Sequence, residues 1–315
     1  MGSSEAQPLT DELTRERRGL LAHSYRMLGS WDDAEDAVQE TFLRALRGWS
    51  GFGHRSSVRV WLYRIATNVC LTVLEQRHRR ALPSGLGPPA LTATEPPVVA
   101  EPSTWVQPIP TSAVLDPESV AVSRESVRLA FIAGLQYLPR QQRAVLLLRE
   151  VMAFSAAEVA EMLDTSVAAV KSSLQRARAR LDEVAPSRDT ALTEPSEPRS
   201  QELLELYMAA WESADASAFS RLLRADATLE GVPSRTWFAG KETCLAFSVP
   251  SMGPRGSWTM VATSANGQPA AATWWHGEPY GLAVLTPAED GIAALTLFAD
   301  PTLVARFLSP PSRIG

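Results

Sequence analysis

The side chains whose types and spacing suggest chemistry lie just past the middle of the sequence, after Ser166. Apolar residues recur there at spacings of three and four, which predicts a helix with one buried face. That face consists of Val167, Val170, Leu174, Ala177 and Leu181. The other face carries Ala168, Ser172, Gln175 and Arg176, with Lys171, Arg178 and Arg180 at its flanks. Small residues let a helix enter a major groove, polar ones can meet base edges, and cations suit phosphates, so the pattern favours DNA binding.

A second helix precedes this one and would position it. Ser155 and Glu158 have the spacing of a capping box, which predicts a helix that runs to about Leu163. Asp164 and Thr165 form a short polar break before the next helix. With a further helix before Ser155, residues 138–181 predict a helix followed by a helix-turn-helix. An ordinary amphipathic hairpin with a solvated basic side is the alternative.

Length and composition restrict the class of protein. The chain has 315 residues and is 45% hydrophobic, enough for two or three domains with buried cores. No apolar run approaches the roughly 20 residues that span a bilayer, and the N-terminus lacks the apolar core of a signal peptide, so we expect a cytoplasmic protein with no membrane partner. Cys70 and Cys244 are far apart and have no disulfide or zinc spacing, so we expect no metal and no cofactor.

Charge is distributed unevenly along the chain. The net charge is −5, but residues 1–82 and 120–190 each carry +2, whereas residues 83–119 carry −4 and residues 191–315 carry −5. Nucleic-acid binding is therefore expected of the first and third segments, and the acidic remainder would weaken or regulate it.

Three helices are predicted before the linker. The first covers residues 9–29, the second starts at Asp32 or Asp33 and ends near Trp49, and the third covers residues 58–80. The acid-rich first turn of the second helix suits the positive end of its dipole. One face of this helix carries polar side chains that could be no more than a solvated surface: Glu35, Asp36, Gln39, Glu40 and Arg44.

The loop between the second and third helices contains the ingredients of a base pocket. Phe52 is bracketed by glycines and is followed by His54, Arg55, Ser56 and Ser57, and the next helix supplies Arg59, Tyr63, Arg64 and Asn68. An aromatic ring can stack on an unpaired base while hydroxyls and amides contact its edge. The alternative is that Phe52 belongs to the core with Trp61, Ile65 and Val69, and for Trp61 we adopt that interpretation.

These motifs together resemble a known family. The runs DAEDAVQETFLRALRGW, WLYRIATNVCL, LPRQQRAVLLLREVMAFSAAEVAEML and VKSSLQRARARL resemble the extracytoplasmic-function sigma factors of the sigma-70 family. The resemblance implies two all-α modules, a region 2 three-helix bundle over residues 9–82 and a region 4 helix-turn-helix over residues 120–184. It also implies core RNA polymerase, through its β′ clamp helices and β flap, and promoter DNA as partners.

The resemblance assigns roles to particular residues. It implies a core polymerase interface of Asp33, Glu35, Asp36, Gln39 and Glu40. It implies capture of a flipped base of the −10 element by Phe52, Ser56, Ser57, Arg59, Tyr63 and Asn68. It implies recognition of the −35 element by Ala168, Ala169, Lys171, Ser172, Gln175, Arg176 and Arg178. The sequence departs from the family at Asp164, where glycine is usual, and at Ser173, where arginine is frequent.

A proline-rich linker, residues 83–119, joins the two modules. Residues 83–117 contain nine prolines and no Lys or Arg, which excludes a long helix or an internal strand. Either an acidic connector that threads through the polymerase channel or an inert spacer fits this composition. Trp105, Gln107, Pro108 and Pro110 form a W-x-Q-P-x-P motif that resembles one subgroup of these factors, in which a C-terminal extension is present.

The extension follows a second linker, residues 185–199, and covers residues 200–310. Two helices near residues 201–214 and 216–223 precede five strand-like runs, separated by turn signals such as Asn266-Gly267 and Asp290-Gly291. Helices followed by a curved antiparallel sheet predict an α+β cone. The order of elements resembles the SnoaL-like domains of the nuclear-transport-factor-two superfamily, some of which are enzymes.

Polar residues that could act in such a cone are few: Asp226, Glu230, His276, Tyr280 and Asp300. A lone histidine near a turn is more often on the surface or in the core than catalytic, so we expect no catalytic residues and no enzyme. The resemblance favours a sigma factor whose SnoaL-like domain regulates it in cis, with a small-molecule ligand possible. A DNA-binding arm fused to an active cyclase or isomerase, and a stand-alone helix-turn-helix regulator, are the alternatives.

Overall fold

The structure is a computed structural model that describes residues 3–53, 56–76, 79–93, 98–101, 104–115, 124–184 and 196–308. The chain forms two compact units. The first comprises Met1–Arg80 and Val106–Arg188, and the second comprises Ala81–Trp105 and Asp189–Gly315. The predicted linker at residues 185–199 lies largely outside the described residues.

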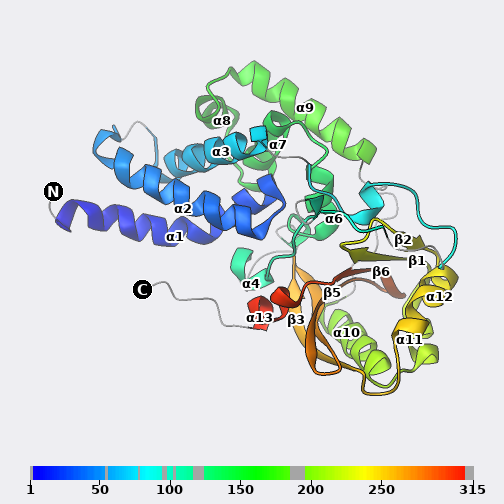
Figure 1. Cartoon of the computed structure of the whole chain (residues 1–315). Helices are drawn as coiled ribbons and strands as arrows, with labels where there is room; N and C mark the ends of the chain where they lie inside the picture. The colour runs from blue at the N-terminus through cyan, green and yellow to red at the C-terminus, as the bar shows by residue number, and fades with distance from the viewer. Residues whose placement is uncertain are drawn as a thin grey trace. The chain divides into compact units, whose positions relative to one another are not determined.

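The first unit begins with a three-helix bundle, in which α1 (Ser3–Leu28), α2 (Trp31–Gly48) and α3 (Val58–Gln76) contact one another, as Figure 1 shows. A 3-10 turn, η1 (Trp49–Gly51), follows α2. Ser30 caps α2 by accepting a hydrogen bond from the Asp33 backbone N–H, so the prediction that Asp32 or Asp33 opens this helix was wrong by one or two residues. Gly29, with φ at +67°, makes the turn between α1 and α2.

The second half of this unit is also helical. It contains α4 (Thr111–Val114), α6 (Leu129–Leu135), α7 (Arg140–Leu146), a π turn η4 (Leu147–Val151), α8 (Ala156–Met162) and α9 (Val167–Val184). Helix α9 packs against α6, α7 and α8. The Ser155 capping box is present with both of its hydrogen bonds, which confirms the predicted start of α8. The predicted helix-turn-helix is therefore formed by α8 and α9.

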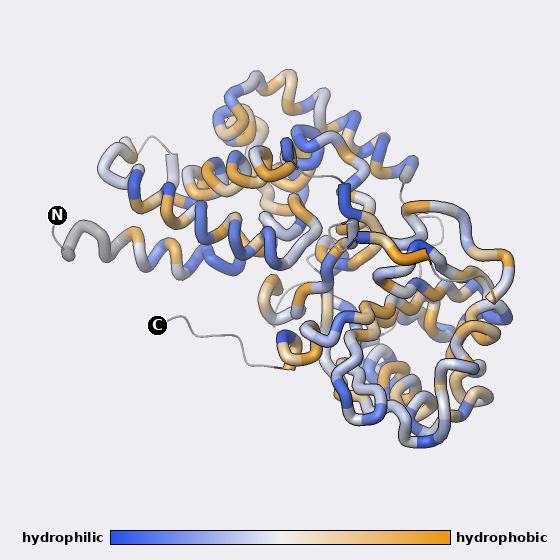
Figure 2. Tube along the Cα trace, in the orientation of Figure 1, coloured by the Kyte–Doolittle hydropathy of each residue, from blue (hydrophilic) through white to orange (hydrophobic). Residues whose placement is uncertain are grey.

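The buried face of α9 is shorter than predicted. Hydrophobic and hydrophilic residues alternate along this helix in Figure 2, and Val170, Ala177 and Leu181 are buried. Val167 is 40% exposed, because it is the first residue of the helix and lies at the turn, so its assignment to the buried face was wrong.

The second unit places helices against one mixed sheet. Its elements are η2 (Pro83–Gly85), α10 (Glu197–Glu212), α11 (Ala216–Leu222), β1 (Leu223–Val232), β2 (Trp237–Ala239), α12 (Lys241–Ser251), β3 (Trp258–Ala265), β4 (Gln268–Trp275), β5 (Glu278–Ala288), β6 (Gly291–Phe298) and α13 (Pro301–Leu308). The strand order is β2-β1-β6-β5-β4-β3. Strands β1 and β6 are parallel, so the expectation of a purely antiparallel sheet was wrong at this one pair.

Helices cover this sheet, and its core lies beneath α10. Helix α10 contacts β3, β4 and β5, α12 contacts β1, and α13 contacts β4 and β5. Aromatic side chains of α10 and α11 lead the core cluster, in which Tyr207, Trp211 and Phe219 pack edge to face. The arrangement confirms the predicted α+β cone, with α10 filling its concave side.

Besides α13, two elements of the cone were absent from the sequence prediction. Strand β2 has only three residues, too few for an alternating pattern. Helix α12 follows Gly240, whose φ is +87°, and contains Pro250 near its end, so its apolar period is weak. Both are held by tertiary contacts with β1.

Residues 81–105 form a segment that we name the strap, and it packs within the second unit. Its Ala90 N–H donates to the Trp237 carbonyl at 2.8 Å, and its Ala100 N–H donates to the Pro233 carbonyl at 2.9 Å. Val99 and Ser234 form a β-bridge. The predicted linker is thus divided at Val106, because its first part is hydrogen-bonded to the cone.

Candidate nucleic-acid interface

The outward face of α9 is open along its whole length. Its seven predicted −35 residues are all exposed, and they are Ala168, Ala169, Lys171, Ser172, Gln175, Arg176 and Arg178. Arg178 is held by an ion pair with Glu150, at 2.5 Å between Nε and Oε1. A helix that presents small, amide and cationic side chains on one solvent-facing side fits a major groove.

The turn before α9 keeps its shape without a glycine. Asp164 has a φ of +49°, in the left-handed region, where aspartate is better tolerated than most residues. The Thr165 N–H donates to the Ala160 carbonyl at 2.9 Å, and Ser166 caps α9 by accepting from the Ala169 N–H at 3.1 Å. Asp164 therefore adopts a backbone conformation that glycine also favours.

The predicted −10 residues lie in different environments. Phe52 is half-buried, stacks on Trp49 at a centroid distance of 5.5 Å and packs at a tilt against Trp61 at 4.8 Å. Ser57 accepts a hydrogen bond from the Val60 N–H and so begins α3, whereas Ser56 is half-buried and Asn68 is exposed. His54 and Arg55, which the sequence also placed in this pocket, lie outside the described residues.

Tyr63 is buried by a residue of the helix-turn-helix module. Only 2% of it is exposed, and its ring packs edge to face against Phe154 at 5.2 Å and His23 at 5.5 Å. The Arg59 guanidinium lies over both Phe154 and Tyr63, at 4.4 and 5.2 Å. Burial raises the pKa of Tyr63 to about 12. Contact of Tyr63 with a base therefore requires Phe154 to move away.

Two of the acidic side chains on the exposed face of α2 form ion pairs within the protein. Asp36 and Gln39 are exposed, while Glu35 pairs with Arg17 and Glu40 pairs with Arg44, each at 2.7 Å. These are surface pairs that a partner could replace at little cost.

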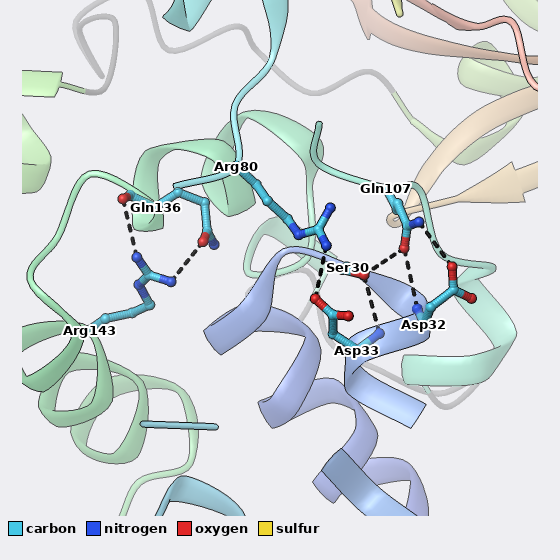
Figure 3. Close-up of polar contacts among 7 residues, drawn as sticks. All are labelled: Ser30, Asp32, Asp33, Arg80, Gln107, Gln136 and Arg143. Carbon is cyan, nitrogen blue, oxygen red and sulfur yellow. Dashed lines mark hydrogen bonds and ion pairs between the residues drawn. The ribbon is translucent and has the colours of Figure 1, made fainter. Parts of the chain in front are cut away.

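Asp33 differs from the rest of the predicted polymerase interface. It is 8% exposed and pairs with Arg80 at 2.9 Å, as Figure 3 shows. The pair joins the start of α2 to the residue that ends the first segment of this unit. Its geometry gives Asp33 a structural role at the base of the helix.

Gln107 of the W-x-Q-P-x-P motif anchors the start of the same helix. Its carbonyl oxygen accepts from the Ser30 hydroxyl at 2.7 Å, and its amide nitrogen donates to the Asp32 carboxylate at 3.0 Å (Figure 3). Its backbone N–H donates to the Gly29 carbonyl at 3.0 Å. The motif thus fixes the α1–α2 turn, a role that sequence analysis did not assign to it.

Arg143 of α7 fastens region 4 to region 2, and sequence analysis missed it. Its guanidinium donates to the Met27 carbonyl at the end of α1 and to Gln136 Oε1 at 2.7 Å. Arg26 of α1 makes a matching contact in the other direction, to the Ser126 hydroxyl at 2.7 Å. Burial lowers the pKa of both arginines to about 10, still far above neutrality. These contacts could not be predicted from the sequence, because no local pattern shows which distant carbonyl or hydroxyl an arginine will contact.

Only two of the five polar residues predicted for the cone line a common cavity. His276 lies in an exposed turn with φ at +50°, Asp226 pairs with Arg224 on the surface, and Asp300 accepts a hydrogen bond from the Thr302 N–H. Glu230 and Tyr280 line one cavity. No described helix is both long and apolar enough to cross a bilayer.

Known proteins match both units of the chain. The Sigma-70 region 2 family matches residues 13–80, and the Sigma-70, region 4 family matches residues 128–181. The chain is 45% identical over 305 residues to the ECF RNA polymerase sigma factor SigG of Mycobacterium tuberculosis H37Rv, covering 94% of this chain and 82% of the relative. The chain belongs to the extracytoplasmic-function sigma factors.

The similarity of this sigma factor to known structures includes its C-terminal unit. The crystal structure of the Mycobacterium tuberculosis extracytoplasmic function sigma factor SigJ matches with a TM-score of 0.61 and 25% identity, over 93% of this chain and 97% of that one. The SigJ sequence of strain H37Rv is 30% identical over 219 residues, covering 68% of this chain and 62% of the relative. The family resemblance inferred from the sequence is confirmed.

Proposed function

We propose that this sigma factor directs core RNA polymerase to promoters through α9 and the loop before α3, and that the structure represents a closed resting form. The single observation that supports the closed form is the burial of Tyr63 beneath Phe154. The −35 face of α9 is exposed in the same unit, so one promoter contact is ready while the other is covered.

Opening requires region 4 to leave region 2. Polar bonds between them include those of Arg143 with the Met27 carbonyl, Arg26 with Ser126, Arg59 with the Met152 carbonyl, and Arg140 with Glu75 at 2.9 Å. Core polymerase, by binding the two regions at separate sites, would supply the free energy that breaks these bonds. Melting then follows capture of a flipped base, which costs a few kcal/mol of unstacking and is offset by stacking on an aromatic ring.

The C-terminal unit, in this proposal, regulates the factor in cis and performs no catalysis. The strap lies between region 2 and region 4 in sequence, and it is hydrogen-bonded to the cone. The cone would therefore restrain the segment that joins the two promoter-binding modules. The separation of His276, Asp226 and Asp300, three of the five polar candidates in the cone, supports this non-catalytic role. As a partner of RNA polymerase, the protein acts in the cytoplasm.

In vitro transcription tests this proposal. Core RNA polymerase is combined with the full chain, or with a form that ends at Ser196 before α10, on a genomic promoter library. Discrete start sites that depend on the protein are expected from both forms, with different yields. Absence of initiation by either form, with DNA bound by the protein alone, would contradict the sigma function. Equal yields would contradict only the cis regulation.

A further inference from the structure

A cavity of about 550 Å³ lies in the first unit, beside α1. Helices α1 and α3 supply its polar side chains, Val114 and Leu115 lie at the end of α4, and Val151 and Met152 lie at the end of η4. The volume falls within the range of about 300 to 1,000 Å³ in which proteins hold small molecules. A molecule in this cavity would contact region 2 and region 4 at the same time.

The lining of this cavity is strongly basic. Arg15, Arg18 and Arg26 lie on α1, and Arg59 lies on α3. Glu16 is the one acid among the described residues that line the cavity, and its Oε2 lies 3.8 Å from the Arg59 Nε. Four positive charges and one negative charge leave a net charge of +3. A cleft lined by one sign of charge concentrates ions of the opposite sign.

Arg26 is the buried member of this set and has one nitrogen without a partner. It is 3% exposed, and its Nε and Nη2 donate to the Ser126 carbonyl and hydroxyl at 3.0 and 2.7 Å. Its Nη1 is buried and has no hydrogen-bond partner within the described residues. A buried charged donor without an acceptor costs free energy, and an anion that accepts from this nitrogen would recover it.

The exposed arginines can reach a ligand without breaking strong bonds. Arg15 is exposed and pairs with Glu12 on the same helix, an interaction that contributes little on a surface. Arg59 is exposed too, and its Nη2 donates to the Met152 carbonyl at a long 3.4 Å. Arg26 is therefore a fixed donor, and the other guanidinium groups can adjust around what it binds.

The ligand class follows from the charge and from the donors. Planar guanidinium groups bind phosphate oxygens through paired hydrogen bonds. A single carboxylate would leave most of the positive charge unbalanced. We propose that this cavity binds a small molecule that carries two or more phosphate groups, with Arg26 as the buried anchor and the three exposed arginines around it.

Such a ligand would favour the closed form, and this part of the inference rests on the proposed function. The cavity has Arg26 of region 2 on one side and Met152 of region 4 on another, so it is complete only while the two regions are packed together. A ligand that binds only this arrangement shifts the population toward it. It would also engage Arg59, which is assigned to the −10 element.

Isothermal titration calorimetry of the full-length protein tests the site without polymerase. The probes are inorganic phosphate, pyrophosphate and tripolyphosphate, in magnesium-free buffer at constant ionic strength. Affinity should rise with each added phosphate group, and tripolyphosphate should bind at least about tenfold more tightly than inorganic phosphate. A short single-stranded DNA tests whether a nucleic-acid backbone is the preferred source of the phosphates.

Two arginines of the first unit form a matched pair of variants. Arg15 and Arg44 are both exposed and each pairs with a glutamate of its own helix, but only Arg15 lines the cavity. Arg15→Ala should weaken tripolyphosphate binding severalfold, whereas Arg44→Ala should leave it unchanged. Arg26→Lys keeps the charge but loses the planar fork, so it should weaken binding by about tenfold, with melting temperature as a check of folding.

The acid of the lining provides a test in the opposite direction. Glu16→Gln removes the one negative charge of the cavity and releases Arg59, so tripolyphosphate should bind severalfold more tightly. Asp11→Asn, at an exposed acid of the same helix outside the cavity, should have no such effect. A variant that merely disturbed the fold would weaken binding instead.

Several outcomes would overturn the inference. These are binding of no phosphate probe, equal losses in Arg15→Ala and Arg44→Ala, weaker binding by Glu16→Gln in a folded protein, or binding of the DNA that tripolyphosphate does not displace. Slower amide exchange in residues 147–152 with tripolyphosphate would support the link to the closed form. Unchanged exchange would remove that link alone, and failure of the transcription test would leave the binding result standing.

Discussion

At the residue scale, one carboxyl group couples stability to pH. Glu230 is buried on β1 and its pKa is raised to about 7, above its unfolded value of 4.5. An acid whose pKa is raised by folding contributes stability that is fully present below the unfolded pKa and is lost as the pH rises through the folded pKa. The native unit is therefore least favoured, with respect to this group, above about pH 7.

We predict that Glu230→Gln stabilises the C-terminal unit at pH 8 and has little effect at pH 5. The gain at pH 8 is up to about 3 kcal/mol, because the variant no longer buries a charge. Urea unfolding of the full chain between pH 5 and pH 8 measures it, with Glu289→Gln as the exposed control. A gain of equal size at both pH values would show that ionisation is not the cause.

Arg176 and Arg180 provide a matched pair on α9. Both are exposed arginines, but Arg176 lies on the predicted −35 face, whereas the Arg180 Nε donates to the Tyr137 carbonyl at 3.0 Å. Arg176→Ala should weaken binding of the polymerase holoenzyme to a −35 element by about 1 to 3 kcal/mol if it contacts a base. Arg180→Ala should change it less. Promoter titration by filter binding compares them, and equal effects would remove the assigned face.

At the element scale, the helix-turn-helix depends on two serine caps. The Ser155 hydroxyl accepts from the Glu158 N–H, and the Ser166 hydroxyl accepts from the Ala169 N–H, so each helix begins at a defined residue. The positive φ of Asp164 lies between them and sets the direction of α9. The direction of the predicted −35 face is therefore set by local hydrogen bonds as well as by packing.

Removing the first cap should destabilise this element. We expect Ser155→Ala to cost about 1 kcal/mol, because the Glu158 N–H loses its acceptor, whereas the bond from the backbone N–H of residue 155 to the Glu158 carboxylate can remain. Thermal unfolding followed by circular dichroism measures the effect. Ser172→Ala, in the middle of α9, is the control, since its hydroxyl only bonds back to the Ala169 carbonyl. A smaller loss in Ser155→Ala than in Ser172→Ala would contradict the capping role.

At the scale of the whole molecule, the proposed closed form depends on the packing of region 2 against region 4. Their contact covers Tyr63 with Phe154 and is supported by the bonds of Arg143 and Arg26. The strap and Gln107 both belong to the segment that joins region 2 to region 4 in sequence. The strap is hydrogen-bonded to the cone, and Gln107 is hydrogen-bonded to the start of α2. Along the chain, this segment therefore joins a part that is bonded to the cone to a part that is bonded to the start of α2.

Phe154→Ala should uncover Tyr63 in the full-length protein. Nitration by tetranitromethane, followed by mass spectrometry, is expected to modify Tyr63 severalfold faster in the variant than in the wild type. Tyr25 and Tyr207 are equally buried and do not stack on Phe154, so their rates serve as internal references for unfolding. A parallel rise at all three tyrosines would indicate general destabilisation, and no rise at Tyr63 would contradict the closed form.

The sequence by itself determined the elements that local rules control. The Ser155 capping box, the apolar period of α9 and the Asn266-Gly267 turn are encoded by neighbouring residues, and all are present. The exposed −35 residues follow from the same period, because the face opposite a buried stripe is solvated.

Only the tertiary structure decided what depends on residues distant in the chain. The burial of Tyr63 by Phe154, the Asp33–Arg80 pair and the division of the proline-rich linker at Val106 each join segments with no shared pattern. Glu230 was one polar residue among five in the sequence. Its raised pKa comes from its burial on β1, which only folding produces. Burial and pairing arise from three-dimensional neighbours, which periodicity along a chain does not specify.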